Sequence, residues 1–326
     1  MADPADAAVF SVPLTTRFRG ITVREGVLLR GRAGWGEFSP FLEYDDATAA
    51  PWLACAREAA DEGWPAPVRD LVPVNVTVPA CDPERAHRIV RAGGCRTAKV
   101  KVAERGQEPA EDEARLEAVR DALNSLAPGG LVRIDANGGW DVQEACRRIP
   151  VLERAAGGLE YVEQPVVSVE DLAVVRRRVG VPIAADESIR RAADPYRVRD
   201  LGAADVAVLK VQPLGGVRAC LRIAEDIAMP VVVSSAVESS VGIAAGVALA
   251  AALPELHHAC GLATVQLLSG DVVTDPLLPV DGALPVRAVQ VDPTRLDAHT
   301  PGADRTAHWR HRLASVAALL DGREAS

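Results

Sequence analysis

The stretch "TAKVKVAERGQEPAEDEARLEAVRDALNSLAPGGLVRIDAN", residues 97–137, contains the pattern that decides the fold. Two short apolar runs typical of strands, 97–102 and 131–137, flank a segment, 111–126, whose apolar residues recur at helical spacing. Strands joined through a helical crossover run parallel to each other. This strand–helix–strand unit therefore predicts an α/β protein with a parallel sheet.

The same unit recurs along the chain, and the predicted strands begin 23 to 34 residues apart. Eight consecutive units predict a closed (β/α)8-type barrel rather than an open sheet. Residues 1–71 have the pattern of a meander and a helix, so we expect an α+β capping domain there, completed by about 284–326, with the barrel over 72–283. The predicted strands are 72–78, 97–102, 131–137, 159–165, 182–188, 205–211, 230–236 and 257–263.

Composition excludes several classes of protein. The chain has 326 residues and a net charge of −9 without a basic run, which argues against nucleic acid and membrane surfaces as partners. No basic segment followed by an apolar core opens the sequence, and no apolar run reaches about 18 residues, so we expect a cytoplasmic protein. Cysteines and histidines lack the spacing of zinc ligands, which predicts ordinary thiols.

Lysine is rare in this sequence: Lys99, Lys101 and Lys210 are the only lysines among 36 basic residues. Lys99 and Lys101 are two residues apart in a predicted strand, so their side chains share one face. Unlike arginine, lysine can lose its proton near neutral pH, as a proton-transferring base must. The alternative is three chance lysines at solvated positions.

Carboxylates end three successive predicted strands: Asp135 in "DAN", Glu163 in "EQP" and Asp186 in "DES". The C-terminal ends of the strands are where barrels of this type build active sites. Three adjacent carboxylates repel one another unless a cation lies between them. An all-oxygen set predicts Mg²⁺, with Mn²⁺ as a substitute. One such carboxylate alone is more often a helix cap, so the prediction depends on the set.

The three lysines are expected to flank this predicted metal site, Lys99 and Lys101 on one side and Lys210 on the other. Apolar walls and a nearby cation both disfavour the ammonium form, so the pKa of such a lysine should fall. This arrangement suits removal of a proton α to a carboxylate, with the metal stabilising the resulting enediolate.

The motifs "KVK", "DAN", "EQP", "DES" and "LK", in this order, resemble the enolase superfamily, and the resemblance covers nearly the whole chain. Lysines on both sides resemble its muconate-lactonizing branch. Mandelate racemase has a histidine after the seventh strand, where this chain reads "SSAVESS" (234–240), and dipeptide epimerases have Asp-x-Asp where it reads "GLATVQLL" (261–268). With "RIDAN" (133–137), these stretches are most similar to the o-succinylbenzoate synthases of menaquinone biosynthesis.

The resemblance implies a hydro-lyase that carries out Mg²⁺-dependent syn-dehydration of 2-succinyl-6-hydroxy-2,4-cyclohexadiene-1-carboxylate. It implies that Lys101 removes the α-proton and then protonates the departing hydroxyl. Lys210 would face the opposite side of the ring as a cation, and Lys99 would hold the substrate carboxylate or tune Lys101. The implied metal ligands are Asp135, Glu163 and Asp186.

The resemblance also assigns residues around this centre. Ser234, Ser235 and Gly261 would lie near the succinyl carboxylate, although hydroxyls at a strand end also cap helices. Arg133 either contacts the carboxylates or fills the barrel floor. Two cap segments, 15–20 and 38–44, resemble loops that close over the barrel mouth. The residues implied to support the ligands are Arg133, Asn137 and Glu187.

Three other interpretations stay open at this point. An N-succinylamino-acid racemase would need lysines on both faces of the substrate, one as acid and one as base. A muconate cycloisomerase would use the same scaffold. An inactive scaffold barrel is disfavoured because unpaired buried charges cost several kcal/mol each without a stability benefit. The sequence does not indicate an oligomeric state.

Overall fold

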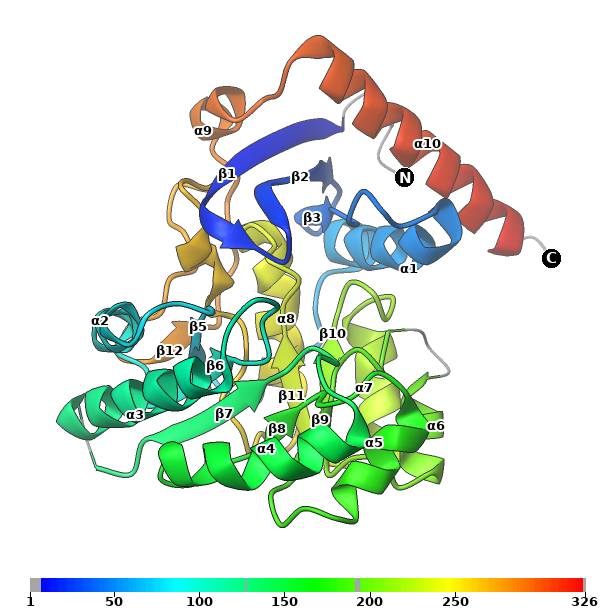
Figure 1. The fold of residues 1–326 in the computed structure, drawn as a ribbon. Coiled ribbons are helices and arrows are strands. Elements are labelled where there is room, and N and C mark those ends of the chain that lie inside the picture. Colours follow the sequence, from blue (N-terminus) through cyan, green and yellow to red (C-terminus); the bar gives the residue numbers. More distant parts are fainter. Residues whose placement is uncertain (1–6, 127, 191–193, 325–326) are drawn as a thin grey trace.

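The computed structural model describes residues 7–126, 128–190 and 194–324. The two ends of the predicted capping domain, 1–6 and 325–326, lie outside this range. An antiparallel sheet with helices α1 (Asp46–Arg57) and α10 (Ala303–Glu324) lies above a parallel barrel whose strands are surrounded by helices (Figure 1). Within the described residues, every helix is too short or too polar to cross a bilayer.

The barrel is built on a seven-stranded sheet, counted over the described residues, whose paired strands all run parallel. Neighbours in the sequence are neighbours in the sheet, as the repeated strand–helix unit predicts. The strands are β5 (Asn75–Val78), β6 (Thr97–Lys101), β7 (Leu131–Asp135), β8 (Val162–Glu163), β9 (Ile183–Ala185), β10 (Val206–Lys210) and β11 (Val231–Ser234).

Two bridge residues take the place of the eighth predicted strand. Cys260 pairs with Val74 and Gly261 pairs with Ser234, both in parallel, so they join the two edges of the sheet. The prediction of a regular strand over 257–263 is therefore wrong in extent but right in position. A Cβ on Gly261 would lie 2.7 Å from Ser234 Oγ, so a larger residue at this closure would have to displace the Ser234 hydroxyl. The predicted parallel α/β barrel with an α+β cap is confirmed.

Other predicted strands are longer than the observed ones; the run 182–188, for example, is a strand only over β9. The run 72–78 divides into β5 and a short strand β4 (Leu71–Pro73), which pairs antiparallel with β12 (Ala283–Pro285). The run 159–165 is a strand only over β8, because Gln164 has a φ of 39° and turns the chain. Both predicted domain boundaries fall in the β4–β12 pair, and they remain predictions.

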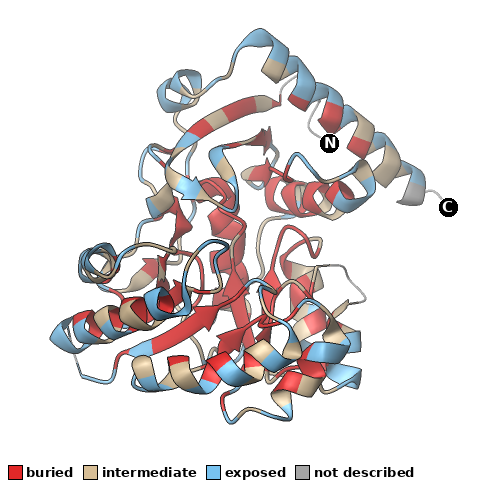
Figure 2. Ribbon diagram, viewed as in Figure 1, coloured by how far each residue is buried: buried red, intermediate tan, exposed pale blue. Residues whose placement is uncertain are grey.

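Side chains alternate between the two faces of the barrel strands. Val100 and Ile134 belong to the large core between strands and helices, whereas Tyr161, Val208 and Val232 form a separate cluster inside the barrel. The strands are buried almost throughout (Figure 2). The helices that cover them are α2 (Pro83–Gly93), α3 (Pro109–Leu126), α4 (Val142–Ala155), α5 (Val169–Arg176), α6 (Asp194–Asp200), α7 (Val217–Ile227) and α8 (Ser240–Ala252).

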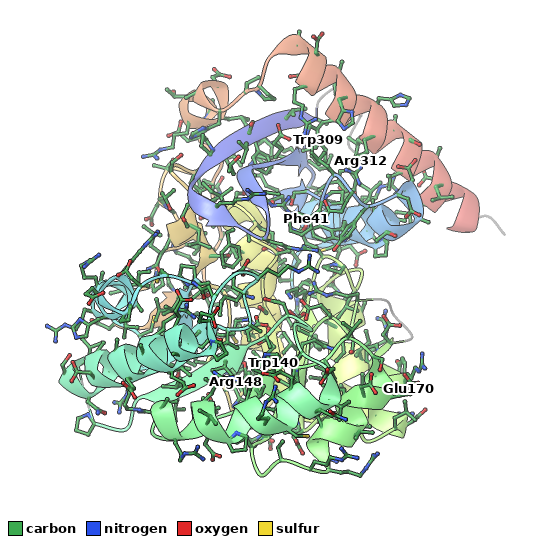
Figure 3. The ribbon with its side chains drawn as sticks, viewed as in Figure 1. Phe41, Trp140, Arg148, Glu170, Trp309 and Arg312 are labelled. Atoms are coloured by element: carbon green, nitrogen blue, oxygen red, sulfur yellow. The ribbon has the colours of Figure 1, made fainter. Side chains whose placement is uncertain are left out.

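The cap has its own hydrophobic cluster, which includes Phe38, Phe41, Trp52 and Trp309. Arg312 donates to Phe41 O at 3.0 Å and fixes helix α10 against the loop after β3. Figure 3 shows Phe41, Trp309 and Arg312 in this part of the molecule. Its elements are β1 (Ala8–Phe18), β2 (Ile21–Arg30), β3 (Trp35–Phe38), α1 (Asp46–Arg57), the π-helical turn η2 (Glu58–Glu62) and α10 (Ala303–Glu324).

Two short helices complete the described chain. The 3-10 helix η3 (Ala263–Leu267) follows the bridge residues that close the barrel, and α9 (Pro293–Ala298) precedes α10. Asp292 caps α9 by accepting from Thr294 N at 2.9 Å. All six cysteines are free thiols, as predicted.

Candidate active site

The register of the parallel strands brings the predicted residues together at the barrel mouth. Lys101 pairs with Asp135, and Asp135 pairs with Glu163, across β6, β7 and β8. On the other side, Lys210 of β10 pairs with Ser234 of β11. Positions that are 24 to 34 residues apart in the sequence thus become direct neighbours, because each crossover returns the chain to the same end of the sheet.

A cavity of about 660 Å³ opens at this end of the barrel. It reaches from the strand ends to residues 17–20, at the end of β1 and in the turn that leads to β2, so the cap contributes to its wall. Glu163 and Arg133 are not part of its lining. The predicted site residues that line it are Lys99, Lys101, Asp135, Asn137, Asp186, Glu187, Lys210, Ser234, Ser235 and Gly261.

The two lysines of β6 share one carboxylate oxygen. Asp135 Oδ2 accepts from Lys101 Nζ at 2.6 Å and from Lys99 Nζ at 3.1 Å. Lys99 also donates to Glu163 Oε1 at 2.7 Å. Burial lowers the pKa of Lys99, but the two carboxylates outweigh burial and hold that pKa well above its ordinary value. The lowered pKa expected for lysines here is therefore not found at Lys99.

Burial opposes ionisation of the two neighbouring carboxylates, Glu163 and Asp135, but their pKa values shift in opposite directions. It raises the pKa of Glu163 to about 8, and the charge of Asp135 adds to the rise. Burial also opposes ionisation of Asp135, yet Lys101 and Lys99 hold the pKa of that carboxyl below its ordinary value. Each carboxyl group is 1% exposed. Additional positive charge at this point would therefore favour the ionised form of Glu163.

Across the cavity, Lys210 forms a hydrogen-bonded ion pair with Asp186, with Nζ 2.5 Å from Oδ1. Arg190 Nη2 lies 3.2 Å from the same carboxylate oxygen. Burial and the charge of Arg190 lower the pKa of Lys210, in the direction predicted for a lysine near a cation. Burial opposes ionisation of Asp186, but Arg190 and Lys210 keep its pKa below the ordinary value.

The donor set of the strand ends fits a hard divalent cation. Asp135, Glu163 and Asp186 offer only carboxylate oxygens, which Mg²⁺ prefers. Lysine ammonium groups form ion pairs with all three carboxylates. With the carboxylates paired in this way, the described residues contain no group of three carboxylate, thiol or imidazole side chains close enough together to hold a metal ion. The assignment of these three residues as metal ligands remains a prediction.

Arg133 lies in the barrel floor, fully buried. Its Nε donates to Glu160 Oε2 at 2.5 Å, and its Nη1 donates to Ala259 O at 2.7 Å, beside the bridge residues that close the barrel. The guanidinium also lies 4.6 Å from the centre of the Tyr161 ring. Of the two alternatives for Arg133, the contacts favour the floor of the barrel over the carboxylates.

Amide side chains orient the groups at the strand ends. Asn137 Oδ1 accepts from Lys101 Nζ at 2.7 Å, while Asn137 Nδ2 donates to Glu187 Oε1 at 3.1 Å. Gln164 Oε1 accepts from Asp186 N at 3.0 Å and fixes the turn after β9. Asn137 and Glu187 are hydrogen-bonded to each other beside Lys101, and their role in supporting the ligands remains a prediction. Gln164 is an orienting residue that the sequence prediction missed.

Two family models match this sequence: an enolase C-terminal domain-like model over residues 82–293 and an enolase N-terminal domain-like model over residues 9–60. The chain belongs to the enolase superfamily. The membership predicted from the strand-end motifs is confirmed.

Curated relatives in this superfamily match nearly the full length. The o-succinylbenzoate synthase of Thermobifida fusca is 66% identical over 96% of each chain. That of Mycolicibacterium smegmatis is 53% identical over 96% of this chain and 95% of its own.

Among solved structures, the muconate lactonizing enzyme of Pseudomonas putida has a TM-score of 0.75 at 22% identity, over 91% of this chain and 98% of its own. The L-Ala-D/L-Glu epimerase of Bacillus subtilis has a TM-score of 0.75 at 23% identity, over 88% of this chain and 96% of its own. At this identity the likeness establishes the shared enolase-superfamily fold.

Other cavity residues of this enolase-superfamily chain had no clear sequence signal. Arg190 reaches the site four residues after Asp186, through the turn that follows β9, and this spacing is common elsewhere in the sequence. In the first cap segment, Arg17 and Arg19 line the cavity. In the second, Phe41 is buried in the cap core beneath the Arg19 guanidinium, 3.8 Å from its ring centre.

Proposed function

We propose that this chain is an o-succinylbenzoate synthase, a hydro-lyase that dehydrates 2-succinyl-6-hydroxy-2,4-cyclohexadiene-1-carboxylate in menaquinone biosynthesis. The observation that carries the proposal is the full-length similarity to curated o-succinylbenzoate synthases at 53% to 66% identity. The contacts of Lys101, whose Nζ lies at the cavity with Asp135 and Asn137, support it.

Lys101 performs both proton transfers in this proposal. As the neutral amine it takes the proton from the carbon α to the substrate carboxylate, and the C–H electron pair moves toward that carboxylate. The resulting ammonium gives its proton to the hydroxyl as the C–O bond breaks, so water leaves and the amine is restored. One nitrogen on one face of the ring accounts for the syn geometry.

Asp135, Glu163 and Asp186 are proposed to hold the cation, and their oxygen donors favour Mg²⁺ over softer metals, with Mn²⁺ as a substitute. When bound, the cation makes the α-proton more acidic by stabilising negative charge on the substrate carboxylate. Lys99 keeps Asp135 and Glu163 in position through its two ion pairs.

Lys210 faces the cavity from the opposite side and is proposed to act as a fixed cation rather than as an acid. Dehydration needs no proton from that side, whereas racemisation does. Ser234, Ser235 and Gly261 are proposed to contact the succinyl arm; Ser235 Oγ is 2.8 Å from Thr264 Oγ1. The substrate is a small carboxylate in either reaction.

The two reactions are separated by testing both substrates with wild type and Lys210→Ala. We expect wild type to dehydrate the cyclohexadiene carboxylate, and Lys210→Ala to keep a measurable part of this activity. Wild type that exchanges the α-proton of N-succinylamino acids but does not dehydrate would replace the proposal with N-succinylamino-acid racemase. Wild type that binds Mg²⁺ but acts on neither substrate would favour a scaffold role.

A further inference from the structure

A second group of buried charges lies behind the cavity wall, where the cap meets the barrel. It consists of Arg24 on β2, Glu37 on β3 and Glu238 before α8, each less than 5% exposed. In the part of the chain that the structure describes, the lining of the cavity does not include any of these three residues. Buried charges are costly unless they are paired and hydrogen-bonded, and the contacts of these three residues are extensive.

Glu37 of the cap anchors the beginning of a barrel helix. Its Oε2 accepts from Gly242 N at 3.0 Å and from the hydroxyl of Ser239, the N-cap of α8. Its Oε1 accepts from Ser39 Oγ at 2.6 Å. A carboxylate at this end of a helix is favoured because the first backbone N–H groups point toward it. The first turn of α8 is thus fixed by a side chain from the cap.

Arg24 extends this connection to the segment between β11 and α8. Its Nη2 donates to Ser39 Oγ at 2.8 Å, and its Nε donates to Val237 O at 3.1 Å. Val237 has a φ of 65°, in the left-handed region that β-branched residues rarely adopt. Glu238 accepts from Ala236 N at 2.7 Å. The charged groups therefore hold a strained segment in place.

The strained segment is part of the cavity wall. Ser234, Ser235, Ala236 and Val237, here called the wall segment, all line the cavity. Behind it, Ser39 Oγ also lies 3.4 Å from Oε1 of Gln212, in the turn that follows β10. The cap, the turn after β10 and the start of α8 therefore meet at Glu37 and Ser39.

We propose that Glu37 is a positioning residue that fixes the wall segment through Ser39, Arg24 and the start of α8, and so sets affinity for the side arm of the substrate. The identity of that arm, a succinyl group, rests on the proposed function. The positioning of the wall segment by Glu37 does not depend on the proposed function. The proposed base, Lys101, lies on β6, and its side-chain nitrogen donates to Asp135 and Asn137 rather than to this group among the described residues, so the effect falls on substrate binding more than on proton transfer.

The test compares Glu37→Gln with Asp271→Asn. Glutamine keeps the shape of Glu37 but loses its charge and one acceptor oxygen. Asp271 is a matched control, because it accepts from Ser240 N at 3.2 Å and Ser240 Oγ at 2.5 Å in the same helical turn. In the described part of the chain, its hydrogen bonds go to Ser240 and Val272 rather than to the wall segment. The measurements are KM and kcat for dehydration, and hydrogen exchange of amides 234–242 by mass spectrometry.

Glu37→Gln should raise KM about tenfold, change kcat less than about twofold and speed exchange in 234–242. Asp271→Asn should leave KM unchanged. An unchanged KM in Glu37→Gln, or an equal rise in Asp271→Asn, would overturn the proposal. If wild type does not dehydrate the substrate, the proposed function fails, and the positioning role is then judged by hydrogen exchange alone. Equal exchange of amides 234–242 in wild type and Glu37→Gln would show that Glu37 does not position the wall segment. If Glu37→Gln does not fold, Ser39→Ala takes its place with the same expected results.

Discussion

Lys101 and Asp135 face each other across adjacent strands, with the lysine nitrogen 2.6 Å from Oδ2 of the aspartate. The same oxygen accepts from Lys99. Asp135 is therefore the common partner of both lysines of β6 and, in the proposed function, a metal ligand as well. Substitutions at Lys101 and at Asp135 should consequently have different effects on proton transfer and on metal binding.

Replacing Lys101 should remove the proposed base while the fold and the carboxylates stay intact. We expect Lys101→Ala to lower kcat/KM for dehydration by about 10³-fold or more. Lys101→Arg is the sharper variant, because arginine keeps the positive charge but does not release its proton near neutral pH. It should be as inactive as alanine. Steady-state kinetics that find Lys101→Arg close to wild type would exclude Lys101 as the base.

Removing one proposed ligand should weaken metal binding directly. We expect Asp135→Asn to lower the affinity for Mg²⁺ or Mn²⁺ by about 100-fold or more, because the ligand loses its charge. Isothermal titration calorimetry without substrate measures this independently of activity. Glu104→Gln is the control, since Glu104 lines the cavity but is not a proposed ligand. Equal affinities for the two variants would contradict the assignment.

Stability should depend on pH through Glu37. Burial raises the pKa of this carboxyl to about 7, against an opposing effect of Arg24 and with a small addition from Glu238. A raised acid pKa gives stability that is present below the ordinary value of 4.5 and is lost as pH rises toward about 7. Glu37→Gln has no such titration.

The free energy of unfolding of Glu37→Gln, relative to wild type, should therefore increase between pH 4.5 and pH 8 by up to roughly 3 kcal/mol. Urea unfolding of both proteins at several pH values measures this difference in the free energy of unfolding. The contributions of other titrating groups cancel because they are the same in the two proteins. Glu43→Gln, at a more exposed carboxylate of the cap, is the control. A constant difference between wild type and Glu37→Gln would show that Glu37 does not titrate in this range.

The ion pair in the barrel floor should be strongly coupled. Arg133→Met takes the guanidinium away from Glu160, a partly buried carboxylate whose other contact is His258 Nδ1 at 2.6 Å. We expect a loss of about 3–5 kcal/mol in the free energy of unfolding. The double variant Arg133→Met/Glu160→Gln should lose less than the sum of the single variants. Strictly additive losses in denaturant unfolding would argue against the pair.

Much of the barrel was predictable because its signals are local. The run 97–102 alternates between inward lysines and outward apolar residues, and the helical segment 111–126 has a different period. Carboxylates at the ends of such runs, including Asp135 and Asp186, must lie at one end of a parallel barrel. These positions follow from the strand pattern alone.

Other features depend on contacts between distant segments. The barrel closes through Cys260 and Gly261, two bridge residues that do not form a strand pattern. In the sequence, nothing distinguishes Glu37 from an ordinary polar residue of an edge strand. It is buried because the cap packs against the start of α8. The lysine pKa prediction assumed a cation beside each lysine, whereas Lys99 faces two carboxylates.

The most direct test of the proposed function follows the ultraviolet loss of 2-succinyl-6-hydroxy-2,4-cyclohexadiene-1-carboxylate. The assay compares wild type with Mg²⁺, wild type with EDTA, and Lys101→Ala with Mg²⁺. We expect fast conversion to o-succinylbenzoate by wild type with Mg²⁺, and its loss in both other arms. No conversion by folded wild type that binds Mg²⁺ would contradict the proposal, as would conversion that persists in Lys101→Ala.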